Sequence, residues 1–202
     1  MAKWYRRLAD VPNVDYGGSP GIDRTLLPEH NATPRESTFM LENRQIESIM
    51  WKTGDVSTSA YPCQRWRTKV VHGETAATTT SRQLRECLEL PGSVSAYHFI
   101  IQQGHVDLWS FRLTEPWVVN EVEKLCKLDI SLVMAHPEPF QLNDQGFVYI
   151  TAFERLIKLY EREGYLDEAL EIAQKAAKLG NQQAALNSIQ EKIAILKREE
   201  IA

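Results

Sequence analysis

Cysteine is scarce in this sequence, and long apolar runs are missing. The 202 residues include three cysteines, Cys63, Cys87 and Cys126, which lie far apart and form no Cys-x-x-Cys pair. Such an odd and scattered set argues against a disulfide scaffold and a cysteine-rich zinc site, and favours a reducing compartment. No stretch approaches the roughly 18 apolar residues of a membrane-spanning helix, and no signal-peptide run follows the first residues. We therefore expect a soluble, cytoplasmic protein.

The sequence also has no large excess of charge of one sign, no phosphate-binding loop and few clustered metal ligands. The net charge of −4 at pH 7 gives no reason to expect nucleic acid or an anionic membrane as a partner. The glycine-rich stretch 17–21 is not a phosphate loop, because no strand precedes it and no Gly-Lys-Ser/Thr follows it. His136 and Glu138 supply two ligands, fewer than a zinc site uses. The sequence predicts neither a cofactor nor a metal.

Two amphipathic helices follow one another near the end of the chain. Apolar side chains recur at Phe153, Leu156, Ile157 and Tyr160, which is the spacing of one stripe on a helix. A second, alanine-rich stripe covers residues 166–177, and a glycine follows each stripe, where helices favour a left-handed terminal residue. A third stripe, over residues 185–196, predicts a capping helix.

The helical hairpin resembles one tetratricopeptide repeat. The residues that match the repeat in register are Phe153, Leu156, Tyr160, Gly164, Leu166, Ala169, Ala173 and Ala176. The resemblance covers residues 150–180, and it departs from the family where Ile157 replaces a small residue, Ala173 replaces an aromatic one, and no proline follows. An ordinary helical hairpin is the alternative. The resemblance implies protein binding, and because such repeats need about three units to be stable, it also implies packing against other protein.

The chain before the hairpin reads as a mixture of helices and strands. Thr33, Pro34 and Glu36 form a capping box that predicts a helix ending near Lys52. Further helices are expected before residue 91 and after residue 115, and a short strand over 130–135.

Residues 61–71 alternate like a strand, with Arg65 and Arg67 on one face. This basic row either binds phosphates or is the charged face of an exposed strand. The acidic balance of the whole chain favours the second interpretation.

Residues 93–113 carry the strongest strand signal. Two apolar runs flank a Gln-Gln-Gly segment, and together they predict a β-hairpin. In that hairpin His98, His105 and Asp107 share a face, and Asp107 lies one diagonal step from His98, close enough to orient its imidazole. These three are the candidate catalytic residues, although no Ser or Cys nucleophile accompanies them.

Four short pieces occur in an order that resembles thymidylate synthases and their phage relatives: residues 23–25, 51–54, 61–67 and the expected strand pair over 90–112. In that family such pieces help to hold a deoxynucleotide phosphate and frame a cysteine nucleophile. Here Gly92 stands at the position of the thiol, and the folate half is missing. The resemblance implies a non-catalytic, nucleotide-shaped fold.

The sequence as a whole predicts an α+β protein. An N-terminal domain, residues 1–146, would hold a small antiparallel sheet and helices, and residues 147–202 would form a helical, tetratricopeptide-like module. The favoured function is that of an adaptor, not an enzyme, which binds a protein or peptide, or a second copy of itself, through Arg155, Lys158 and Glu161. Two alternatives stay open: a nucleotide-binding or degenerate enzyme domain that uses Arg65 and Arg67, and a self-assembling, phage-type structural protein.

Overall fold

The structure of the chain is a computed structural model that describes residues 8–19, 21–22, 32–41, 44–53, 56–58, 72–90, 92–141, 147–180 and 183–199. Within residues 32–58 it describes the backbone alone. The chain divides into two compact units, Met1–Pro139 and Phe140–Ala202. None of the described helices combines the length and the apolarity that crossing a membrane requires.

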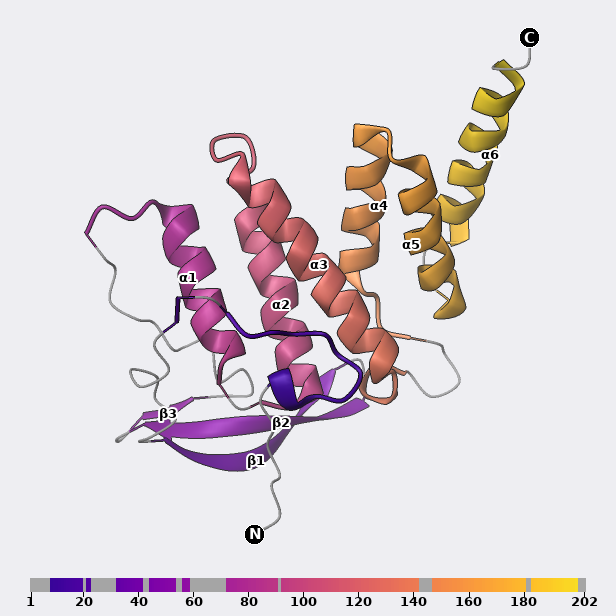
Figure 1. The fold of residues 1–202 in the computed structure, drawn as a ribbon. Coiled ribbons are helices and arrows are strands. Elements are labelled where there is room, and N and C mark those ends of the chain that lie inside the picture. The colour runs from indigo at the N-terminus through magenta and orange to yellow at the C-terminus, as the bar shows by residue number, and fades with distance from the viewer. Residues whose placement is uncertain are drawn as a thin grey trace. The chain divides into compact units, whose positions relative to one another are not determined.

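The first unit is built on three antiparallel neighbours, helices α1 (Ala76–Leu88), α2 (Val94–Trp109) and α3 (Trp117–Ala135), with α2 between the other two (Figure 1). Thr75 caps α1 by accepting from the backbone N–H of Thr78 at 3.2 Å. Ser93 caps α2 by accepting from the N–H of Ala96 at 3.1 Å. Each hydroxyl satisfies one of the donors that the first turn of a helix leaves without a partner.

Helix α2 occupies the segment in which we expected a β-hairpin. Nine of its 16 residues are buried, because it packs on both α1 and α3. A helix that is covered on several sides has no polar stripe, so its sequence reads as the near-continuous apolar run of a buried strand. The expected short strand over 130–135 is likewise the last part of α3.

Three antiparallel strands lie where we expected a helix over residues 33–52. They are β1 (Ala32–Leu41), β2 (Arg44–Thr53) and β3 (Val56–Thr58), in the order β1-β2-β3. Ala32 pairs with Thr53 at one end of β1 and Leu41 with Arg44 at the other. The local capping signal is outweighed here by a segment rich in β-branched and aromatic residues, which favour pairing.

The α+β prediction is wrong. The described chain is mostly helical, and where its side chains are described the regular elements are helices. The antiparallel sheet that the prediction placed at residues 93–113 is not formed, since those residues belong to α2 and the turn after it.

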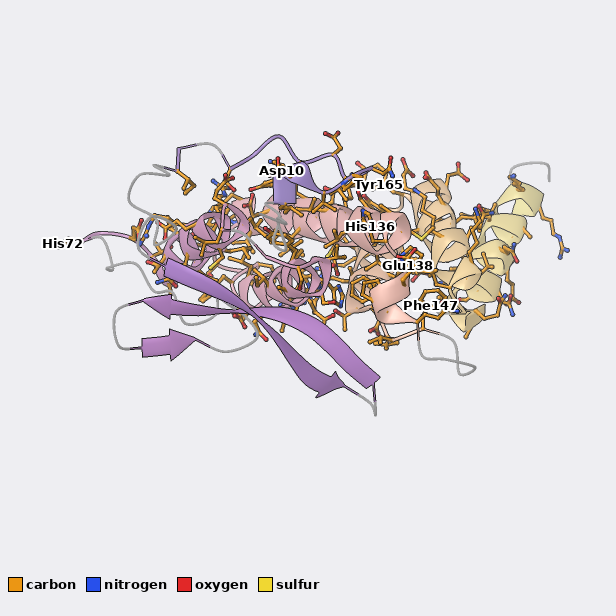
Figure 2. The ribbon with its side chains drawn as sticks, turned by 90° about the horizontal axis from the view of Figure 1, so that it is seen from below. Asp10, His72, His136, Glu138, Phe147 and Tyr165 are labelled. Carbon is orange, nitrogen blue, oxygen red and sulfur yellow. The ribbon has the colours of Figure 1, made fainter. Side chains whose placement is uncertain are left out.

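An N-terminal segment crosses in front of these helices in Figure 1, where it is drawn in indigo. It begins with the 3-10 helix η1 (Leu8–Asp10), whose Leu8 is fully buried, and Val11 is buried beside it. The ring of His136, at the end of α3, forms a 2.7 Å hydrogen bond to the carbonyl oxygen of Pro12 through Nε2. Figure 2 labels His136 together with Asp10 of η1.

The second unit contains the helices predicted near the end of the chain: α4 (Thr151–Glu163), α5 (Leu166–Lys178) and α6 (Gln183–Glu199). A short 3-10 turn, η4 (Glu138–Phe140), precedes them. The side chains of Phe153, Leu156, Ile157 and Tyr160 on α4 are buried, as the stripe predicted. Gly164 ends α4 with φ of 85°, a left-handed conformation that costs glycine little.

Candidate functional site

The predicted catalytic residues are not brought together. Because α2 is a helix, residues seven apart lie on nearly the same side, whereas residues nine apart point in opposite directions. His98 and His105 are therefore both fully buried, while Asp107 is exposed and accepts a 2.7 Å hydrogen bond from Gln103 on the same helix. His98, His105 and Asp107 therefore do not share a face of α2.

The acidic partner of His98 is Asp129 on α3. Nδ1 of His98 lies 2.7 Å from Oδ1 of Asp129, and both side chains are fully buried. Burial raises the pKa of the Asp129 carboxyl, and the charge of His98 and its hydrogen bond oppose that rise. Since no substrate can reach the pair from solvent, its geometry serves the packing of α2 on α3.

Sequence reasoning missed Asp129, although a signal for it was present. Asp129 stands on the apolar stripe of α3, between Cys126 and Val133, where a charge is rarely buried without a partner. A carboxylate inside such a stripe predicts a buried donor on the facing helix.

The remaining predicted groups are placed as follows. Arg65 and Arg67 lie outside the described residues. Within the described ranges, no group of three or more His, Cys, Asp or Glu side chains could hold a metal ion. The polar face of α4 is described in full: Lys158 pairs with Glu154, Arg155 is half-buried, and Glu161 forms a 2.8 Å ion pair with Lys192 of α6.

These contacts change the expected role of the α4 face. Glu154 also accepts from the hydroxyl of Tyr149 at 2.6 Å, and the hydrogen bonds from Lys158 and Tyr149 lower the pKa of its carboxyl. Glu161 ties α4 to α6, so it shapes the module. Of the three predicted contact residues, Lys158 is the exposed one.

Helix α6 carries an apolar stripe whose side chains become more exposed toward the C-terminal end of the helix. The stripe consists of Leu186, Ile189, Ile193 and Leu196, at helical spacing. Ile189 is fully buried, Ile193 is half-buried, and Leu196 is 48% exposed. The cover ends because α6 has 17 residues and its neighbour α5 has 13, so the last turns of α6 rise past α4 and α5 (Figure 1).

A basic side chain borders the uncovered end of this stripe. Lys197 lies one turn beyond Ile193 and is exposed, and no described residue forms an ion pair with it. We call Ile193, Leu196 and Lys197 the α6 surface. The sequence predicts a capping helix here. The continuation of its apolar stripe to Leu196 was a signal that the stripe extends past the part of α6 that α5 covers.

Comparison of the chain with protein-family models, with curated proteins and with solved structures gives no match. The resemblances to a tetratricopeptide repeat and to thymidylate synthases therefore stay predictions. One component of the second is corrected, since the expected strand pair over residues 90–112 includes helix α2.

Proposed function

We propose that the second unit is a protein-interaction module that takes an amphipathic helix of a partner protein against the α6 surface. The observation that carries the proposal is the apolar stripe of α6, which runs without interruption from the buried Ile189 to the half-exposed Leu196. A single exposed leucine is ordinary on a protein surface. A stripe that leaves the core while keeping its helical register can pack against the apolar stripe of a second helix.

The charge beside the stripe indicates the chemistry of the partner. Lys197 supplies a full positive charge next to the stripe, and this exceeds the partial negative charge of about one half that a helix C-terminus carries. A partner helix with apolar residues at i, i+3, i+4 and i+7 and with Asp or Glu along its border would match both features.

The hairpin of α4 and α5 holds this surface in place. Ala169, Ala173 and Ala176 of α5 are buried, and such small side chains let the facing backbone approach closely. The ion pair between Glu161 and Lys192 then fixes α6 to α4. These residues shape the tetratricopeptide-like module that we infer.

Affinity capture with the immobilised full chain tests the proposal through a matched pair of variants. Leu196→Gln removes the apolar contact, whereas Ile195→Gln changes a neighbour that is equally exposed, at 47%, but points away from the stripe. We expect a protein retained by the natural chain and by Ile195→Gln to be lost from Leu196→Gln and from Lys197→Glu. A synthetic helix copied from the retained protein should bind with the same dependence.

Four results would overturn the proposal. The first is equal retention by Leu196→Gln, and the second is retention of nothing beyond bare resin. The third is a change of oligomeric state: light scattering that shows a dimer of the natural chain, dissociated by Leu196→Gln, would assign the α6 surface to a second copy. Loss of capture with Leu113→Gln alone would move the binding surface to the 76% exposed Leu113 in the first unit.

A further inference from the structure

The segment 15–19, which we call the strap, is held against the helices of the first unit by one buried carboxylate. Glu89, just after α1, is 4% exposed, and its Oε1 accepts from the hydroxyl of Tyr16 at 2.8 Å and from the backbone N–H of Ser19 at 2.6 Å. Gly18 has φ of 87°, a conformation that lets the chain turn so that both donors reach the same oxygen. The strap is thus fixed in place over the helices.

A cavity of about 270 Å³ lies between the strap, α1 and α3. Its apolar lining comes from Leu88 of α1 and from Leu125 and Leu128 of α3. This volume lies just below the range of roughly 300–1,000 Å³ that is usual for sites of drug-sized ligands. The cavity therefore suits a small molecule with a short apolar body.

Four charged side chains line the same cavity, and two of them are already neutralised. Arg85 donates to Oε1 of Glu121 through Nε at 2.9 Å and through Nη2 at 2.7 Å. Asp15 on the strap and Lys124 on α3 are exposed, and neither forms an ion pair with any described residue. One open positive charge and one open negative charge therefore border an apolar lining.

We propose that this cavity binds a small zwitterion with an apolar side chain, the class to which the aliphatic amino acids belong. Lys124 takes the carboxylate, Asp15 takes the ammonium group, and the side chain lies against Leu88, Leu125 and Leu128. The net charge of the four lining residues is zero, which disfavours ligands that carry charge of one sign. The site belongs to the first unit and does not depend on the function proposed for the second.

A set of matched probes tests the class of ligand by calorimetric titration of the full chain. L-Leucine carries all three features, 4-methylpentanoate lacks the ammonium group, 3-methylbutylamine lacks the carboxylate, and glycine lacks the side chain. We expect leucine to bind saturably, and each single-charge analogue to bind about two- to fivefold more weakly, the range of one exposed ion pair. Glycine should bind more than about tenfold more weakly, because it buries no apolar side chain.

Two variants and one control locate the binding. Lys124→Gln and Asp15→Asn should each weaken leucine about two- to fivefold, the change expected from the loss of one exposed charge. Lys127→Gln alters an exposed lysine on the same helix that pairs with Glu123 at 2.7 Å and does not line the cavity, so leucine binding should not change. The proposal is overturned if leucine does not saturate, if 4-methylpentanoate binds as tightly as leucine, or if Lys124→Gln and Lys127→Gln have equal effects.

Discussion

The buried pair of Asp129 and His98 gives the first unit a pH dependence that surface carboxylates do not provide. Oδ1 of Asp129 contacts His98, while its buried Oδ2 finds no hydrogen-bond partner among the described residues. A carboxylate that is half satisfied in the interior favours its protonated form. Burial of the carboxyl is the main cause of the raised pKa of Asp129.

Replacing Asp129 by asparagine should remove one identifiable part of the pH dependence of stability. Because the folded-state pKa is raised above the ordinary value of 3.8, the native state holds its proton more tightly than the unfolded chain does. Asp129 therefore contributes fully to the free energy of unfolding below about pH 3.8. This contribution is lost as the pH rises from 3.8 through the folded-state pKa.

Urea unfolding of both proteins, measured at a series of pH values from 3 upward, checks this prediction. We expect the difference in stability between the natural chain and Asp129→Asn to shift in favour of the variant as the pH rises. Parallel pH profiles would show that Asp129 does not titrate in the folded protein as its burial implies.

Gly104 of α2 lies directly against the side chain of Leu84 on α1. A Cβ atom at this position would lie 2.5 Å from Cδ2 and 2.8 Å from Cδ1 of Leu84, which is itself buried. Glycine costs a helix interior about 1 kcal/mol relative to alanine, so its presence here is explained by the space that Leu84 occupies.

The crowding predicts a non-additive pair of substitutions. Gly104→Ala should lower the free energy of unfolding by about 1 kcal/mol, because overpacking of roughly 1–3 kcal/mol exceeds the gain in helix propensity. Leu84→Ala alone should cost about 2–5 kcal/mol. In the Leu84→Ala background Gly104→Ala should be neutral or stabilising, and a double-mutant cycle by urea unfolding measures the coupling. Strict additivity would contradict the contact.

At the scale of elements, the strap is tied to the end of α1 through Glu89. Glu89→Ala removes the acceptor of both Tyr16 and Ser19 and should lower the free energy of unfolding by about 2–4 kcal/mol, since bonds to a charged group are strong. Glu89→Gln keeps an oxygen at the same position and should cost less than about 1 kcal/mol. Hydrogen exchange of the amides of residues 16–19 reports the release of the strap. Equal effects of the two variants would assign the loss to the packing of the side chain.

The elements that sequence reasoning located are those whose pattern is local. Helices α4 and α5 combine a single apolar stripe with a terminal glycine, so residues within a few turns of each other specify them. Helix α2 was misassigned because its apolar surface is set by α1 and α3, which lie elsewhere in the sequence. The pairing of β1 with β2 joins residues that are 3 to 21 positions apart, from Leu41 with Arg44 to Ala32 with Thr53, and it outweighs the capping box at Thr33.

The candidate sites divide in the same way, into one with a local sequence pattern and others formed by residues far apart in the sequence. The exposed end of the α6 stripe was visible in the sequence once the stripe was followed to Leu196. His98 and its partner Asp129 are 31 residues apart in the sequence. The cavity is lined by the strap, α1 and α3, which are also separate in the sequence, so local spacing predicts neither feature. Long-range contacts of this kind are where a single sequence carries the least information.

At the scale of the whole molecule, each of the two units has its own apolar core. Tyr97, Ile101 and Leu108 are fully buried in the first unit, and Phe153 and Leu156 in the second. A cavity made in one core should therefore act first on the hydrogen bonds of its own unit, because local stability follows the packing around each segment.

Phe153→Ala tests this division through residue-resolved hydrogen exchange on the full chain. Truncation of a buried phenylalanine costs about 3–5 kcal/mol. Since about 1.4 kcal/mol corresponds to a tenfold change in an equilibrium constant, we expect hydrogen exchange in α4 and α5 to accelerate by at least about a hundredfold. The matched variant Tyr97→Phe removes the 2.6 Å hydrogen bond from the Tyr97 hydroxyl to the carbonyl of Leu90 and should affect α2 by a smaller factor. For Phe153→Ala we expect protection in α2 and α3 to stay as in the natural chain. An equal acceleration throughout both units would instead show that residues 1–139 and 140–202 unfold as one cooperative body.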